Sequence, residues 1–306
     1  MLKVFGFIVF LSLTPASTSF SRQTVAPDSS SISRDNLFRE PLNIPLKPVR
    51  WYTMFERMPY DWGRWGDLSF RKDKVEAWAW ITTLSAVLVL TDDDTYTPSD
   101  RFYRSSGAAA YWSDFFAGFG DGRTQFALAG AYAVYGVVFN DDRAFRTGSQ
   151  IVEAVLASGA VVQLLKHVTG RESPFVRSTP TGRWSLFPNQ IDYSRYVPYF
   201  DAFPSGHVCT ALATVIVISE NYPEVTWIRP LGYVLTGLLG VGMVNNGIHW
   251  YSDYPLGIFL GYYFGMIAAH PEGFKFSEGA GTTQAGFSLL PRLNRGGVGM
   301  SLLVSF

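Results

Sequence analysis

Six apolar stretches of helical length follow one another along the middle of the chain, and they constrain its fold more than any other feature. Loops rich in Gly, Pro, Asp and Ser separate them, and these residues end helices and form turns. We therefore predict an all-α protein whose main domain, residues 75–270, is a six-helix bundle. The predicted helices cover residues 75–91, 123–139, 148–168, 207–220, 229–246 and 254–269.

The composition limits the class of protein that can result. Of the 306 residues 47% are hydrophobic, which is enough for a large core, so disorder is excluded as the main state. Only 16% are charged, below the share in ordinary soluble domains, which indicates either a membrane-embedded chain or a densely apolar globule. The formal net charge is zero, so no long-range field would attract nucleic acid, and any anion site must be local. The single cysteine, Cys209, forbids an intrachain disulfide.

The two ends of the chain differ from the helical domain. Lys3, a short apolar run over residues 4–13 and the small residues that follow have the order of a secretory signal peptide, and the run is too short to span a bilayer. We predict a signal peptide over residues 1–19 and an exported protein of the cell envelope. Residues 20–74 are predicted to be a flexible lead-in and an aromatic cap segment, with core packing of the aromatic residues as an equal alternative. Residues 271–306 are predicted to be a Gly-rich tail with one or two short strands.

Two segments carry residues that can hold an anion. The third predicted helix ends with Lys166 and Arg171, two cations separated by a glycine that lets the backbone turn. The fourth predicted helix starts at Ser205-Gly206-His207, where a hydroxyl, backbone N–H groups and an imidazole meet the positive end of a helix dipole. Taken singly, each segment has an ordinary explanation: a solvated pair of cations, an N-cap serine and a packed histidine.

A third segment, between the last two predicted helices, holds His249 and Asp253 four residues apart. If a helix begins there, both side chains fall on the same side. The carboxylate can then accept one imidazole N–H and leave the other ring nitrogen free to attack. A purely structural hydrogen-bonded pair is the alternative. It is the order of the three segments on one chain that favours a functional site.

Three motifs follow one another along the chain: a basic motif, then Pro-Ser-Gly-His, then His and Asp four residues apart. In this order they resemble the type 2 phosphatidic acid phosphatase and vanadium haloperoxidase superfamily, over roughly residues 75–270. The resemblance implies that His249 is a nucleophile that forms a phosphohistidine, that Asp253 holds its ring, and that His207 is the general acid. It implies no metal and no other cofactor. The implied phosphate ligands are Lys166, Ser205 and the amide of Gly206, joined by Arg171.

The chain departs from the family pattern at two positions. Ser173 stands where the family has an arginine before the proline of the basic motif, and Met243 stands where it has another, six residues before His249. Each arginine would give charge-assisted contacts of about 1.5–3 kcal/mol per hydrogen bond, so losing both can cost several decades of rate. Nearby residues that can compensate are Arg171, Arg177, Arg183, Asn245 and Asn246.

Three functions follow from these observations. The first is a metal-independent phosphatase that hydrolyses a phosphate monoester or a pyrophosphate, with a phosphorylated lipid or a small soluble molecule as substrate. The second is a catalytically silent envelope protein that keeps the fold for binding or structure, as the two missing arginines suggest. The third is a vanadate-dependent peroxidase. The chain is either soluble or peripherally attached in the periplasm or an integral membrane protein, and the sequence does not fix its oligomeric state.

Overall fold

The computed structural model describes residues 52–272, 286–294 and 297–305. These residues belong to two units, a helical unit within Leu46–Phe274 and a strand pair within Lys275–Phe306. The predicted signal peptide and the predicted lead-in as far as residue 51 lie outside the described residues and stay predictions.

All six predicted helices are present, and the all-α class is confirmed. Their ends agree with the predicted ends to within one residue, except that the third begins at Asp142 instead of residue 148. These helices are α2 (Val75–Leu90), α5 (Gly122–Phe139), α6 (Asp142–Thr169), α8 (Gly206–Asn221), α9 (Ile228–Asn245) and α10 (Tyr254–Ala269). The description as a six-helix bundle is incomplete, because the described residues contain four further α-helices. These are α1 (Thr53–Ser69), α3 (Asp92–Ser105), α4 (Gly107–Ala117) and α7 (Gln190–Arg195).

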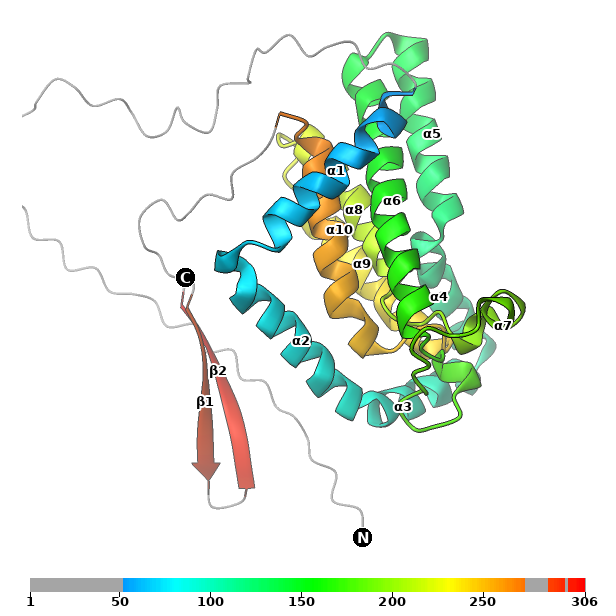
Figure 1. Cartoon of the computed structure of the whole chain (residues 1–306), viewed down its shortest axis with the longest axis vertical. Coiled ribbons are helices and arrows are strands. Elements are labelled where there is room, and N and C mark those ends of the chain that lie inside the picture. Colours follow the sequence, from blue (N-terminus) through cyan, green and yellow to red (C-terminus); the bar gives the residue numbers. More distant parts are fainter. Residues whose placement is uncertain (1–51, 273–285, 295–296, 306) are drawn as a thin grey trace, which may run out of the picture. The chain divides into compact units, whose positions relative to one another are not determined.

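Helix α1 occupies the aromatic segment for which a cap and core packing were equal alternatives. It lies across α6 and α10 (Figure 1). The indole N–H of Trp62 donates to the carbonyl of Ala157 on α6 at 3.0 Å, and Trp65 stacks on Phe264 of α10 with ring centroids 5.8 Å apart. These two contacts attach the segment to the core helices, while other aromatic side chains of α1, such as Phe55, are exposed.

Helix α3 is strongly polar, so no apolar periodicity in the sequence predicts it. Three aspartates fill its first turn, where the helix dipole favours negative charge. The chain bends by 61° between the end of α2 and α3. This bend turns Asp92, which is fully buried, toward the inside of the helical unit.

The centre of the helical unit is formed by α6, α8, α9 and α10, which run side by side (Figure 1). Helix α10 can approach the start of α8 closely because Gly257 has no side chain. A Cβ at Gly257 would lie 2.7 Å from the carbonyl oxygen of Ser205, which is too close for van der Waals contact. Ile151, Ile216 and Leu260, from α6, α8 and α10, are fully buried between these helices.

Many apolar side chains of the described residues are exposed on the outer helices. They include Trp80, Val87 and Leu90 on α2, Val134, Val137 and Phe139 on α5, and Leu231 and Val234 on α9. Among the described helices, α6 is long and apolar enough to cross a membrane, and the bent pair formed by residues 72–90 and 92–105 also passes if it counts as one span. Core helices of soluble proteins pass the same test, and 44% of the apolar window of α6 is buried.

The C-terminal unit contains two strands, β1 (Gly286–Asn294) and β2 (Gly297–Ser305). They pair antiparallel, with Gly286 opposite Ser305 and Asn294 opposite Gly297. Two antiparallel strands that follow one another in sequence form a β-hairpin.

Candidate active site

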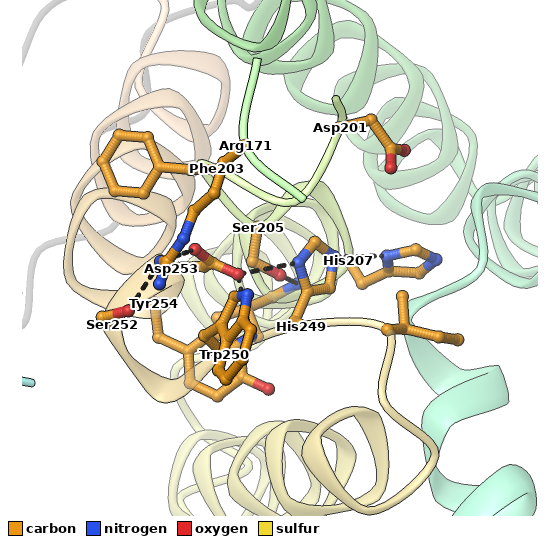
Figure 2. A network of polar contacts seen from close by, with 12 residues as sticks. Arg171, Asp201, Phe203, Ser205, His207, His249, Trp250, Ser252, Asp253 and Tyr254 are labelled. Carbon is orange, nitrogen blue, oxygen red and sulfur yellow. Dashed lines mark hydrogen bonds and ion pairs between the residues drawn. The ribbon is translucent and has the colours of Figure 1, made fainter. Parts of the chain in front are cut away.

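The two motif histidines and the motif aspartate meet at one end of the helical unit. His207 comes from the first turn of α8, and His249 from the loop between α9 and α10. His207 Nδ1 lies 3.2 Å from His249 Nε2, and His249 Nδ1 lies 3.4 Å from Asp253 Oδ2 (Figure 2). The three side chains thus form a continuous chain of polar contacts, in which the aspartate lies on one side of His249 and His207 on the other.

The loop that carries His249 is fixed by its own backbone. Gly247 has a φ of +78°, a left-handed conformation that glycine adopts without strain, and its carbonyl accepts the N–H of Phe175 at 3.1 Å. The N–H of Trp250 donates to Asp253 Oδ2 at 2.8 Å, and the Trp250 indole donates to the Glu172 carbonyl at 2.8 Å. The oxygen of Asp253 that faces His249 is therefore held by a second donor.

The predicted anion ligands lie beside the histidines. Lys166, in the last turn of α6, is buried, and its Nζ lies 3.5 Å from Asp201 Oδ2. A Cβ built on Gly206 would lie 4.0 Å from Lys166 Nζ, so the ammonium group reaches the first N–H groups of α8. Ser205 is the N-cap of α8, where its hydroxyl accepts the Val208 N–H at 3.4 Å and keeps its own hydrogen as a donor. A cation, a hydroxyl and a helix N-terminus converge there, which suits an anion.

Arg171 is placed differently from what the sequence led us to expect. Its side chain is fully buried behind Asp253, on the side away from His207 (Figure 2). One terminal nitrogen donates to Asp253 Oδ1 at 2.5 Å, and the other donates to Asp92 Oδ2 at 2.5 Å. Both terminal nitrogens are therefore occupied by carboxylates, and this geometry argues against Arg171 as a phosphate ligand.

Burial shifts the pKa values of the three central groups. Burial, followed by the neighbouring His249 and Lys166, lowers the pKa of His207 to about 3, and burial and Lys166 lower the pKa of His249 to about 3. Burial raises the pKa of Asp253 to about 6, against the opposing effect of Arg171. Near neutral pH both imidazoles are therefore uncharged, so His249 Nε2 carries a lone pair while its Nδ1 hydrogen is directed at Asp253.

Comparison with protein families gives a match that contains these residues. Residues 148–273 match the family model described as the PAP2 superfamily. The chain carries a PAP2 superfamily domain. The match includes Lys166, His207, His249 and Asp253, so the family resemblance of the sequence motifs is confirmed.

Two solved structures are similar to the chain that carries this PAP2 domain. LpxE of Aquifex aeolicus is 19% identical, with a TM-score of 0.43, over 57% of this chain and 92% of its own. A protein described as the first transmembrane PAP2 type phosphatidylglycerolphosphate phosphatase, from Bacillus subtilis, is 12% identical, with a TM-score of 0.43, over 74% of this chain and 98% of its own. No curated protein sequence matches the chain.

The two unusual positions of this PAP2 domain are both buried. Met243 packs in a core cluster with Leu239, Trp250 and Tyr254. Ser173 donates its backbone N–H to the Pro198 carbonyl at 2.8 Å. Neither residue brings a positive charge toward the histidines, so the two arginines of the family pattern have no replacement at their own positions.

Sequence reasoning missed three polar residues of the site. Asp92 and Ser252 join Arg171 behind Asp253, with the Ser252 hydroxyl donating to Asp92 Oδ2 at 2.6 Å. Asp201 pairs with Lys166. Ser252 lies directly beside Asp253 in sequence and could have been considered. Asp92 is one of three adjacent aspartates and Asp201 lies in a long loop, and no spacing rule distinguishes either residue from a solvated carboxylate.

Proposed function

We propose that the chain is a metal-independent phosphatase that hydrolyses a phosphate monoester or a pyrophosphate through a phosphohistidine on His249. The observation that carries this proposal is the contact chain from Asp253 through His249 to His207, beside Lys166 and the N-terminus of α8. A nucleophile oriented by a carboxylate, an adjacent acid and a set of fixed donors are the groups that phosphoryl transfer needs. Membership of the PAP2 superfamily supports a phosphatase-type function.

In the first step, the lone pair of His249 Nε2 forms a bond to phosphorus while the bond from phosphorus to the leaving oxygen breaks. His207 gives a proton to that leaving oxygen. The phosphorylated ring of His249 is positive, and the carboxylate of Asp253 balances this charge. In the second step, water loses a proton to His207 and its oxygen bonds to phosphorus. The N–P bond breaks, inorganic phosphate leaves, and both histidines return to their starting forms.

The low pKa of His207 restricts when it can act as an acid. With a pKa of about 3, the ring carries no proton to donate at neutral pH. A bound phosphate dianion beside the ring favours the charged imidazolium and raises this pKa. His207 therefore acquires its catalytic proton together with the substrate. The half-buried ring must also turn away from His249 to admit the phosphoryl group.

The test is phosphate release by the purified full chain from an aryl phosphate, phosphatidic acid and an isoprenoid pyrophosphate. His249→Ala should reduce release to the level of a protein-free blank, since no nucleophile remains. His167→Ala is the matched control, because this histidine stacks on Tyr193 outside the contact chain, and it should release phosphate as the unchanged protein does. Equal release by His249→Ala and the unchanged protein would contradict the proposal. A phosphoprotein trapped by rapid quenching should be acid-labile, as N–P bonds are.

The substrate class that we favour is a phosphorylated lipid, and the location that we favour is the cell envelope with membrane association. Exposed apolar side chains on α2, α5 and α9 suit contact with lipid. The apolar α6 has the length of a membrane span. A small soluble ester is the alternative. Phosphatidic acid cleaved faster than the aryl phosphate would support the lipid, and the reverse order would favour the soluble ester.

A catalytically silent envelope protein is the second candidate. The observation that favours it is that Ser173 and Met243 are buried and bring no cation to the site. Lys166, which reaches the α8 N-terminus, is itself paired with Asp201. No phosphate release from any member of the substrate panel, by a protein that is folded, would favour this candidate over the phosphatase.

A further inference from the structure

The Arg171 guanidinium joins the site to a helix that lies outside the matched family region. Arg171 donates to Asp253 Oδ1 and Ser252 Oγ through one terminal nitrogen, at 2.5 and 2.7 Å. Through the other it donates to Asp92 Oδ2 at 2.5 Å and to the Thr181 carbonyl at 2.9 Å. All three charged side chains are fully buried.

The surroundings leave this guanidinium little freedom. Its central carbon lies 4.7 Å from the ring centroid of Trp184 and 5.3 Å from that of Trp250. The backbone carbonyl of Arg171 accepts the N–H of Ala202 at 3.0 Å, in the segment that leads into α8. Arg171 is thus fixed by both its side chain and its backbone, and its contacts reach the segments that carry Asp253 and His207.

The charges in this cluster have opposite effects on Asp253. The cation of Arg171 favours the ionised carboxylate, whereas the like charge of Asp92 disfavours it. One terminal nitrogen of Arg171 donates to Asp92 and the other to Asp253, so the guanidinium stabilises two carboxylates instead of Asp253 alone. Asp253 thus stays ionised, and its second oxygen, Oδ2, faces the Nδ1 hydrogen of His249.

We propose that Arg171 and Asp92 are a pair of positioning residues for Asp253: Arg171 keeps the carboxylate ionised and directed at His249, and Asp92 holds the guanidinium in place. This inference rests on the proposed function for its catalytic consequence, but the state of Asp253 can be measured without catalysis. The pair takes no part in binding phosphate. Arg171 lies two residues before the position where the family pattern has its phosphate-binding arginine, and its role is to position Asp253.

The variants to compare are Arg171→Gln, Asp92→Asn and the double variant, in the full chain. Arg171→Gln removes the cation that contacts both buried carboxyl groups, so Asp253 should bind a proton at higher pH. Asp92→Asn removes the like charge and leaves the whole guanidinium to Asp253, so Asp253 should bind a proton at lower pH. We expect shifts of about 1 pH unit or more, in opposite directions, with the double variant in between.

Asp93→Asn is the matched control. This aspartate is adjacent in sequence, but its side chain is 45% exposed and pairs with Arg177 at 2.9 Å, so the same substitution should leave the pKa of Asp253 unchanged. The other charged or titratable groups near His249 and Asp253 are Lys166, Asp201, His207 and Tyr254, and none of them changes in these variants.

The first readout is nitrogen NMR of the histidine rings at a series of pH values. The chain has only four histidines, so the signal that disappears in His249→Ala identifies His249. The second readout is the pH at which phosphate release falls on the acid side. Opposite shifts of both readouts in the two single variants would support the proposal, because general damage to the fold cannot move them in opposite directions.

Shifts in the same direction, or no shift in a variant whose circular dichroism is unchanged, would overturn the proposal. If Arg171→Gln does not fold, Asp92→Asn decides alone: a shift to lower pH supports the pair, and no shift overturns it. If the unchanged protein releases no phosphate, the proposed function fails, and the NMR shifts still test the positioning pair.

Discussion

Met243 replaces a charged residue of the family pattern with an apolar one, and its surroundings explain why the change is not easily reversed. The side chain is 2% exposed and packs against Trp250 and Tyr254. Met243→Arg would bury a cation among apolar side chains, which should destabilise the protein by about 3 kcal/mol or more. Thermal unfolding measures this, with Met243→Leu as a volume-matched control that should stay near the unchanged protein. An unchanged melting temperature together with faster phosphate release would show instead that the new side chain reaches the substrate.

At this scale, spacing predicted the residues that are close in sequence. His249 and Asp253 are four residues apart, and their contact follows from the turn between them. Ser205 and His207 were placed by the helix start that they form. The contact between Ser252 and Asp92 spans 160 residues and depends on the bend after α2, so no local pattern contains it. The buried contacts of Arg171 could not be predicted for the same reason, since its two carboxylate partners come from distant parts of the chain.

The close approach of α10 to the start of α8 sets the distance between the two halves of the site. Gly257→Ala would place a Cβ 2.7 Å from the Ser205 carbonyl, so α10 or the α8 N-cap must move. We expect a loss of stability of about 1–3 kcal/mol and slower phosphate release at temperatures where the variant is still folded. Gly159→Ala on α6 is the control, because its Cβ meets nothing within 4 Å, and it should be neutral or stabilising by up to about 1 kcal/mol. Equal effects of both substitutions would contradict this explanation.

Among the elements, the apolar helices could be predicted and the polar or aromatic ones could not. Helices α2, α5, α8, α9 and α10 follow their apolar stretches to within one residue. Helix α3 carries three aspartates in its first turn and an internal proline, so hydrophobic periodicity gives no signal for it. The aromatic residues of α1 suited either an irregular cap or the core, and only the tertiary contacts of Trp62 and Trp65 distinguish the two.

For the molecule as a whole, exposed apolar surface and zero net charge lead to a prediction about vesicles. We expect the full chain to float with phosphatidylcholine vesicles in a density gradient, since apolar contact needs no charge on the lipid. Added phosphatidylglycerol or 0.5 M salt should change the bound fraction little, because screening acts only on charges. Bovine serum albumin in the same gradient is the negative control. A chain that stays at the bottom of the gradient, monodisperse without detergent, would contradict membrane association.

The bend between α2 and α3 also bears on how small a working version of this protein can be. A shortened protein that starts where the family match starts, at residue 148, would contain every motif residue and would still lack Asp92. The guanidinium of Arg171 would then have only one carboxylate partner in a buried place, and the ring of Trp250 would lose its edge contact with Tyr96. A shortened protein that keeps this buried cluster intact must therefore be longer than the family match and must include the start of α3.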